Sequence, residues 1–261
     1  MKALINKALG IFDIKLIRKS SYERLVFSAK RFRDYELLSM IDEKFFMDYL
    51  KNLRFSKAQL RQDLFVLSEL GFKQKGFFVE FGATNGVDLS NTHILETKFH
   101  WEGVLAEPAQ IWHSALKKNR AAAIETGCVW ISTGEKLLFN EVSNGKHDGE
   151  LSTIDSFTNV DSHAKFRNSA SNKYEVTSIS LRDMLKKHNA PKKIDYLSID
   201  TEGSEFEILK SFNFDEYDIK IITCEHNFTP MREKIYILLT KNGYERKYSE
   251  ISQFDDWYVK K

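Results

Sequence analysis

Two acidic residues and a histidine follow apolar runs of the sequence. Asp200 and Glu202 come directly after residues 194–199, and His226 follows residues 219–224. If both runs are strands of an open α/β sheet, these side chains lie at the strand ends, where such sheets bind ligands. Carboxylates can orient a substrate, accept a proton or hold a divalent cation, and an imidazole suits general-base work near neutral pH. We therefore take Asp200, Glu202 and His226 as candidate catalytic residues.

Structural roles are the alternative for this part of the sequence. Thr201 and Ser204 could cap the helix predicted after them, and Glu205 could interact with the dipole of that helix. His226 could be hydrogen-bonded for structure alone. Capping does not account for two acids at the end of one strand, which favours a role in a site.

A glycine-containing turn follows another apolar run, residues 76–81. Gly82 and Gly86 allow positive φ and let a ligand approach the backbone closely. Their G-x-x-x-G spacing differs from the dinucleotide fingerprint G-x-G-x-x-G, and such turns also occur without a ligand. Glu107 ends the next predicted strand, 21 residues after Gly86, where an acid binds ribose hydroxyls in Rossmann-like sheets. The turn and the acid together predict a nucleoside-type cofactor.

Residue spacing argues against several other kinds of site. Gly71 and Gly76 have the spacing of a P-loop, but Phe77 stands where a phosphate-binding Lys is needed. The sequence contains no H-E-x-x-H, no G-x-S-x-G and no Tyr followed four positions later by Lys. A nicotinamide-dependent oxidoreductase is therefore a weaker alternative.

Strands and helices that would position these residues alternate along the chain. The predicted strands are 76–81, 103–106, 122–130, 194–199, 219–224, 244–248 and 254–259. The predicted helices are 88–99, 109–119, 181–188, 204–212 and 231–241. We expect an α/β fold with a doubly wound, mostly parallel sheet and an antiparallel closing strand.

The rest of the chain suggests two additions to this sheet. Residues 1–70 are predicted to form a helical appendage, which leaves residues 71–261 as the main domain. Residues 131–175 are polar and turn-rich, with a possible strand at 136–140. Because this segment is too long for an ordinary connection, we predict a functional insertion.

The composition is that of a globular protein, with 42% hydrophobic and 29% charged residues among 261. A net charge of +2 argues against a protein that binds nucleic acid over its whole surface. Cys128 and Cys224 are too few and too far apart for a disulfide scaffold or zinc ribbon, so we expect free thiols. We predict a cytoplasmic protein, because no apolar stretch approaches a membrane span and no signal cleavage site follows the basic N-terminus.

The small net charge hides two parts of opposite sign. Residues 1–75 contain 16 Lys and Arg against 9 Asp and Glu, a net of +7, and residues 76–261 have a net of −5. A solvated helix surface, or a face that docks on the domain or on a second subunit, is one interpretation. Attraction of a phosphate-bearing acceptor or of an anionic inner membrane surface is the other. A homo-oligomer through the N-terminal helices and a peripheral membrane location both stay open.

Five sequence segments in a fixed order resemble one protein family. FFVEFGATNGV, SNT, WEGVLAEP, IDYLSIDTEGSEFEIL and CEHN resemble the FkbM-type S-adenosylmethionine-dependent methyltransferases. The earlier QDLF also looks like a short motif of the family, and the resemblance runs from about residue 56 to residue 243. The joint order is much more specific than any single motif.

The resemblance implies a class I, Rossmann-like methyltransferase sheet with S-adenosylmethionine as the methyl donor. It assigns donor contacts to Glu80, Gly82, Ala83, Asn85, Gly86 and Ser90. By the same resemblance, Glu107 would hold the ribose hydroxyls and Asp200 would face the methyl group. Members of the family methylate hydroxyl oxygens, often of sugars or polyketides, and bacterial members commonly occur with genes for capsule or other glycan synthesis. We therefore expect a sugar or nucleotide-sugar acceptor.

The expected mechanism is direct, in-line transfer of the methyl group. His226 would remove the proton of the acceptor hydroxyl, with Asp200 or Glu202 orienting it. A divalent metal is not predicted, but a cation held by Asp200, Glu202 and His226 that bridges two sugar hydroxyls is an alternative. A second alternative is a non-catalytic module that keeps the fold, although the presence of all three side chains argues against it.

Overall fold

The chain divides into two compact units, residues 1–40 and residues 41–261. The structure is a computed structural model that describes residues 18–143, 145 and 149–261. In the first unit it describes one helix, α2 (Lys19–Met40). The first 17 residues, to which the basic N-terminal segment belongs, lie outside the described residues.

The second unit begins with short helices. They are η2 (Glu43–Phe45), α3 (Phe46–Asn52), η3 (Leu53–Phe55) and α4 (Gln62–Glu69). Helices therefore occupy most of residues 19–69, but residues 56–61, which were expected to continue the helical pattern, are not helical. The division between units falls after residue 40, however, so these four elements group with the sheet-containing part of the chain.

A seven-stranded mixed sheet forms the centre of the second unit. Its strands, with bounds, are β1 (Phe77–Phe81), β2 (Glu102–Ala106), β3 (Ala123–Glu125), β8 (Lys193–Ile199), β9 (Asp218–Glu225), β10 (Tyr244–Lys247) and β11 (Asp255–Lys260). The order is β10-β11-β9-β8-β1-β2-β3. The pairs between β9 and β3 are parallel, and β11 is antiparallel to β9 and to β10. The prediction of an α/β fold with a mixed sheet is confirmed.

The two central strands, β1 and β8, are apolar because the sheet is covered on both faces. In β1, Phe78 and Val79 are fully buried, as are Tyr196 and Leu197 in β8. Continuous apolar runs of this kind are typical of parallel strands with helices on both sides. From β1 the chain proceeds to β2 and β3 in one direction, and from β8 to β9 in the other. A crevice for ligands forms outside the strand ends where the order reverses in this way.

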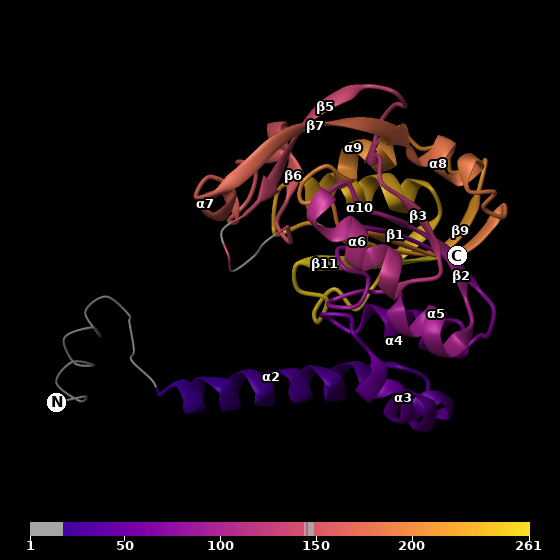
Figure 1. The fold of residues 1–261 in the computed structure, drawn as a ribbon. Helices are drawn as coiled ribbons and strands as arrows, with labels where there is room; N and C mark the ends of the chain where they lie inside the picture. Colours follow the sequence, from indigo (N-terminus) through magenta and orange to yellow (C-terminus); the bar gives the residue numbers. More distant parts are fainter. Residues whose placement is uncertain (1–17, 144, 146–148) are drawn as a thin grey trace, which may run out of the picture. The chain divides into compact units, whose positions relative to one another are not determined.

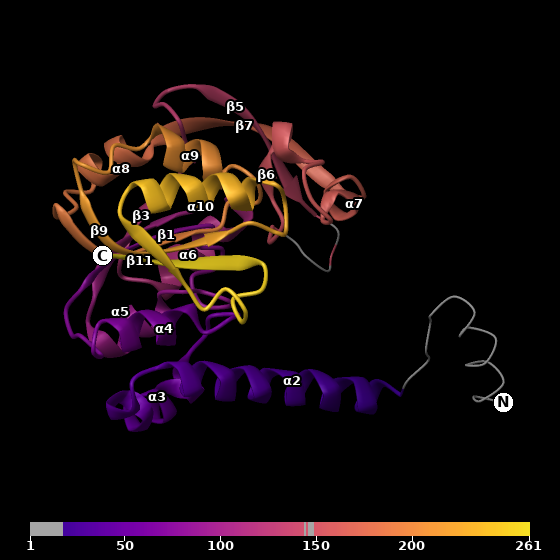
Figure 2. The ribbon, with the colours of Figure 1, turned by 180° about the vertical axis from the view of Figure 1, so that it is seen from behind.

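Helices lie on both faces of this sheet. They are α5 (His93–Phe99), α6 (Gln110–Asn119), α8 (Leu181–Lys187), α9 (Glu205–Ser211) and α10 (Met231–Lys241). Figures 1 and 2, which view the molecule from opposite sides, show α9 and α10 above the sheet and α4 and α5 below it. The two faces are therefore covered, as the buried strands require.

A second sheet of four strands contains most of the predicted insertion. Its elements are β4 (Cys128–Trp130), β5 (Lys136–Val142), β6 (Thr153–Ile154) and β7 (Ser171–Ser180), with η4 (Asp155–Phe157) and α7 (Ala164–Arg167) between β6 and β7. The strand order is β4-β7-β5-β6. The strand expected at 136–140 is confirmed as β5. The ten-residue β7, its partner along the whole length of β5, was not predicted.

Two predicted elements were wrong in their extent. The single strand expected at 122–130 is two strands, because β3 pairs with β2 in the large sheet while β4 pairs with β7 in the small one. A Glu125 carboxylate oxygen accepts the backbone N–H of Gly127 at 2.9 Å, which turns the chain between them. The helix expected at 88–99 begins only at His93, because the preceding residues are hydrogen-bonded to β1.

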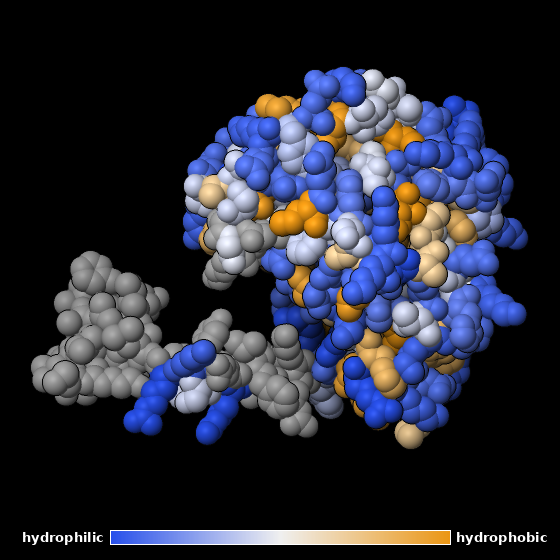
Figure 3. Space-filling view, in the orientation of Figure 1, coloured by the Kyte–Doolittle hydropathy of each residue, from blue (hydrophilic) through white to orange (hydrophobic). Residues whose placement is uncertain are grey.

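On the face of the molecule in Figure 3, hydrophilic residues predominate, and apolar residues occur in separate groups. Large apolar side chains that are exposed, such as Ile111, Leu138 and Ile237, belong to different elements. Scattered apolar residues of this kind are normal on a protein surface. The helices that the structure describes are too short or too polar to cross a lipid bilayer.

Gly103 sets how closely β1 and β2 pack, and its replacement tests the register of the large sheet. A Cβ at this position would lie 2.4 Å from ring atoms of Phe78, its partner in β1. We expect Gly103→Ala to lower the free energy of unfolding by about 1–3 kcal/mol, because overpacking a buried site forces neighbours to move. Urea denaturation measures the change, with exposed Glu102→Ala in the same strand as the control. Equal stability of the two variants would contradict this register.

Candidate active site

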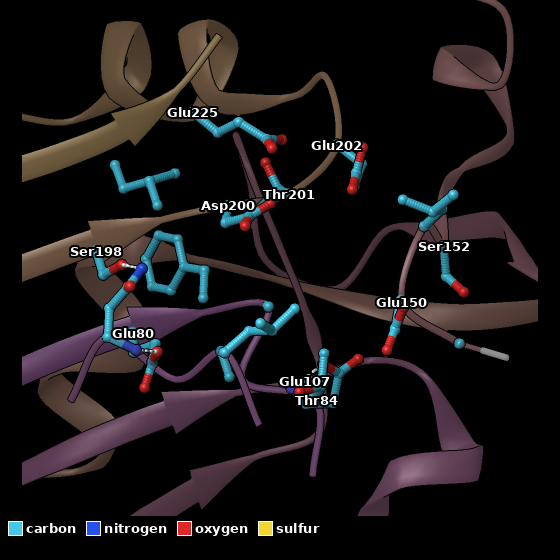
Figure 4. A pocket seen from close by; sticks show the side chains of 18 of the residues that line it. Glu80, Thr84, Glu107, Glu150, Ser152, Ser198, Asp200, Thr201, Glu202 and Glu225 are labelled. Carbon is cyan, nitrogen blue, oxygen red and sulfur yellow. Dashed lines mark hydrogen bonds between the residues drawn. The ribbon is translucent and has the colours of Figure 1, made fainter. Parts of the chain in front are cut away.

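A cavity of about 560 Å³ lies where β1, β8 and β9 end. Its wall includes the turn after β1, the ends of β2 and β9, the turn after β8, the start of β11 and the segment between β5 and β7. Figure 4 shows Asp200 and Glu225 together on one wall, with Glu107 on the opposite wall and Glu150 toward the small sheet. The cavity therefore occupies the crevice in which sheets of this kind bind ligands.

Protein contacts explain the two glycines of the turn after β1. Gly82 has a φ of +71°, and a Cβ there would lie 2.1 Å from the carbonyl oxygen of Asp200. Gly86 has a φ of +79°, and a Cβ there would lie 2.6 Å from Cγ of Arg120. Close approach of a ligand to the backbone and a purely structural turn were both open from the sequence. The atoms that crowd them belong to the protein, so the turns after β1 and β8 are held in contact with each other.

Glu80 in β1 holds the segment that leads to α5. Its carboxylate accepts hydrogen bonds from the Ser90 hydroxyl at 3.0 Å, the Asn91 backbone N–H at 2.7 Å and the Thr92 hydroxyl. The buried Arg120 donates to the Ser90 and Thr92 hydroxyls, and its Nη1 lies 3.8 Å from Glu80. Burial raises the pKa of Glu80, and the charge of Arg120 opposes this rise. Glu80 and Ser90 thus border the cavity and also fix its wall.

Glu107 connects the end of β2 to the glycine turn. Its Oε2 accepts the backbone N–H of Thr84 at 2.7 Å, and its Oε1 accepts that of Ala109 at 2.8 Å. Burial raises the pKa of Glu107 to about 7, although both N–H groups favour the ionised form. Each carboxylate oxygen has a further lone pair, and the side chain borders the cavity. Glu107 can therefore accept hydrogen bonds from two hydroxyls of a ligand.

Three acidic side chains meet where β8 and β9 end. Oxygens of Asp200, Glu202 and Glu225 lie within 4.8 Å of one another. The strands pair side by side up to Ile199 and Cys224, which brings the residues that follow together. Burial and the charge of Glu202 raise the pKa of Asp200 well above its usual range. Burial and the charge of Asp200 do the same to the pKa of Glu225. This group favours a positive charge beside it.

Glu202 is held by the segment between β5 and β7. The fully buried Arg167 donates to Oε2 of Glu202 at 2.6 Å and makes two hydrogen bonds to Asp161, at 2.8 and 3.0 Å. His163 Nδ1 lies 3.4 Å from the same Oε2, and that contact raises the pKa of His163. Glu202 has a φ of +59°, which is uncommon for a residue with a side chain. The small sheet therefore positions an acid of the large sheet.

His226 does not border this cavity. It lies beside a second, smaller cavity of about 320 Å³, and its Nε2 is 3.7 Å from Asp256 Oδ1. Its Nδ1 accepts the backbone N–H of Phe228 at 3.0 Å. Burial lowers the pKa of His226 to about 4, although Asp256 opposes this. The structure thus separates His226 from Asp200 and Glu202, the two acids with which the sequence analysis grouped it.

The residues after Asp200 form a turn that is stabilised by Glu205 rather than by hydroxyl caps. The Glu205 carboxylate accepts backbone N–H groups of Thr201 at 2.9 Å and Gly203 at 3.0 Å. The Ser204 hydroxyl donates to the Thr201 hydroxyl and makes no capping bond to α9. The hydroxyl caps that were the alternative interpretation are therefore absent from this turn. The acids at the strand end do not serve as caps of α9 either.

The structure brings most of the predicted site residues to one cavity. Those that border it are Glu80, Gly82, Asn85, Ser90, Glu107, Asp200 and Glu202. Ala83 and Gly86 do not border it, because the turn folds them against the protein interior, and His226 points elsewhere. Glu225 and Asp255 border the cavity and were not predicted. Their positions at the end of β9 and the start of β11 are the feature of the sequence from which they could have been predicted.

In the part of the chain that the structure describes, two groups of side chains have the oxygen or nitrogen atoms to hold a metal ion. They are Asp200, Glu202 and Glu225, and Asp161, His163 and Glu202. In the second group Arg167 already bonds to both acids. The first group has no arginine or lysine in an ion pair with Asp200 or Glu225, within the range that the structure describes.

Residues 80–257 match the family model described as the methyltransferase FkbM domain. Among solved structures, a methyltransferase FkbM from Methylobacillus flagellatus KT is similar, with 13% sequence identity and a TM-score of 0.43. The similarity covers 72% of this chain and 44% of that one, so this chain spans less than half the length of its relative. No curated protein matches the sequence.

Arg167 should contribute strongly to stability, because it is the positive partner of two buried acids. We expect Arg167→Met to lower the free energy of unfolding by about 3–5 kcal/mol, since Asp161 and Glu202 would lose their counter-charge. Urea denaturation of the full chain measures the loss. Lys165→Met, an exposed change in the same helix, is the control, and a loss no greater than in the control would contradict the role of Arg167.

Proposed function

Because the chain belongs to the FkbM methyltransferase family, we propose that it transfers a methyl group from S-adenosylmethionine to a hydroxyl oxygen of a sugar or sugar-containing acceptor. The main support for the proposal is the position of Glu107, which is buried at the end of β2 and faces the cavity across from Asp200. An acid at this position of a Rossmann-like sheet accepts the hydroxyls of a ribose. We infer that the large sheet is of the class I methyltransferase type.

The cavity suits such a donor in size and in chemistry. Its volume of about 560 Å³ lies within the range of small-molecule and cofactor sites. Glu107 can accept two hydroxyls at one end. At the other end, Asp200 borders the cavity, at the position where the family resemblance places the methyl group. Glu80, Asn85 and Ser90 border the intervening wall.

The reaction needs two reactants held in line. S-adenosylmethionine supplies a methyl group on positively charged sulfur. On attack by the acceptor oxygen, the carbon–sulfur bond would break with its electrons left on sulfur, and the hydroxyl proton would pass to a base beside the acceptor, for which His163 is the candidate. The side chains around the cavity would hold the acceptor oxygen on the far side of the methyl carbon and exclude water. Alignment of this kind can supply a large part of the rate enhancement.

A polar acceptor is supported by the side of the cavity that faces the small sheet. Glu150, Ser152, Ser162 and His163 border that side, and Phe166 lies among them. Several hydrogen-bonding groups beside an aromatic ring suit a ring with hydroxyls, because its polar edge and apolar face can both be satisfied. We therefore propose a sugar, free or nucleotide-linked, as the acceptor.

Donor binding is the direct test of this function. We expect calorimetric titration of the full chain to detect binding of S-adenosylmethionine and none of NAD. Glu107→Gln should weaken donor binding about tenfold or more, because a charged acceptor of hydroxyl hydrogen bonds is lost. Glu102→Ala on the same strand is the control. Binding of NAD in place of the donor would indicate an oxidoreductase, and donor binding without turnover on any sugar would indicate a non-catalytic module.

Two histidines provide a separate test of the acceptor side. His163 borders the cavity and His226 does not, so we expect His163 to contact the acceptor hydroxyl. His163→Asn should lower turnover about 100-fold or more, which is the scale of a lost proton-transfer contact. His226→Asn should change turnover little. If His226→Asn lowered turnover and His163→Asn did not, the base would be His226, as expected from the sequence.

A further inference from the structure

We propose that Asp200, Glu202 and Glu225 form a binding site for a divalent cation that prefers oxygen ligands, Mg²⁺ or Mn²⁺. The site itself stands on geometry, and its role in binding an acceptor rests on the proposed function. The ligand set differs from the one considered in the sequence analysis, because Glu225 takes the position expected for His226. Oxygens of the three carboxylates lie within 4.8 Å of one another at the cavity wall.

Glu225 points to a ligand independently of the cluster. Only 8% of this residue is exposed, and its Oε2 is buried without a hydrogen-bond partner. Figure 4 shows its side chain directed into the cavity beside Asp200. A buried carboxylate oxygen without a partner is costly, so an atom of this kind marks a place where a ligand belongs.

The Glu202 carboxylate lies at the same site, and its neighbours contact one of its two oxygens. Arg167, His163 and Asn227 all approach its Oε2, at 2.6, 3.4 and 3.4 Å. Oε1 therefore remains available to a cation. The carboxylate cannot turn away easily, because Arg167 is itself fixed by two hydrogen bonds to Asp161.

Among the described residues, Arg167 is the one arginine or lysine paired with the three acids; it bonds to Glu202 and is already shared with Asp161. His163 also approaches Glu202, at 3.4 Å. The neighbouring group of Asp161, His163 and Glu202 is the poorer cation site for the same reason, because a guanidinium occupies it. Asp200 and Glu225, in contrast, lie together on one wall of the cavity, and neither forms an ion pair with an arginine or lysine of the described residues.

The chemistry of the ligands identifies the class of cation. Three carboxylates without sulfur or imidazole favour Mg²⁺, Mn²⁺ or Ca²⁺ over Zn²⁺ or Cu²⁺. Mg²⁺ is usually bound by few protein carboxylates and completes its shell with water and substrate oxygens. The open side of the site faces the cavity, so two adjacent oxygens of an acceptor can complete the shell. The acceptor class that fits is one with neighbouring hydroxyls, as in a sugar ring.

Metal titration without donor tests the site. We expect the full-length chain, freed of metal with EDTA, to bind one Mn²⁺ by calorimetry and to broaden the electron paramagnetic resonance signal of free Mn²⁺. Asp200→Asn and Glu225→Gln should each weaken binding about tenfold or more, because even outer-shell partners contribute 10–100-fold. Glu150→Gln, which alters a carboxylate elsewhere on the same cavity, should bind as the wild type does. Mg²⁺ should compete with Mn²⁺.

The outcomes separate this proposal from the proposed function. Absence of Mn²⁺ binding to the wild type, or equal binding by Asp200→Asn and Glu225→Gln, overturns the cation site. If S-adenosylmethionine still binds in EDTA, the methyltransferase proposal survives that result. If Mn²⁺ binds as expected but the donor does not, the cation site stands and the donor assignment fails. Thermal melting followed by circular dichroism identifies a variant that has not folded, and the other variant then decides.

Discussion

The buried contact between Arg167 and Glu202 is the constraint on which the site depends. Glu202 follows a central strand of the large sheet, and Arg167 comes from a short helix between two strands of the small sheet. Neither charge is stable in the interior alone, since a buried ion needs a partner and further hydrogen bonds. Asp161 supplies those bonds to Arg167. One ion pair therefore joins the two sheets at the cavity.

A second buried arginine stabilises the opposite wall of the cavity. Arg120 follows α6, and it links the segment after the glycine turn to Glu80 and Glu96. The glycines allow this arrangement because a side chain at Gly82 or Gly86 would collide with protein atoms. The turn is thus shaped by packing before any ligand binds. At each wall a buried arginine lies beside a buried acid, Arg120 beside Glu80 of β1 and Arg167 beside Glu202 after β8.

Sequence patterns were sufficient where the signal is local. Apolar runs identified the strands of the large sheet, because parallel strands buried on both faces have continuous apolar sequences. Asp200 and Glu107 were predicted because a position at a strand end can be recognised from one segment of sequence.

Other features depend on contacts between distant residues. The turn of His226 away from the cavity depends on Asp256 and on the backbone of Phe228, and neither contact has a periodic signature in the sequence. Arg167 was missed for the same reason, since its partners lie 6 and 35 positions away. Strand β7 was missed because its alternating polar residues resemble a loop.

The two sides of the cavity differ in the same way, because one depends on the strands of a single sheet and the other on contacts between distant residues. The wall with Glu80 and Glu107 is built from consecutive strands of one sheet, so its geometry follows from the fold itself. The wall near the small sheet depends on the contact of Arg167 with Glu202 and on the Thr153 hydroxyl, which donates to the Glu202 carbonyl at 3.0 Å. Between these two anchors the residues that face the cavity are not needed for the large sheet. Under the proposed function, substitutions there would alter which acceptor is bound while the wall with Glu80 and Glu107 keeps its shape.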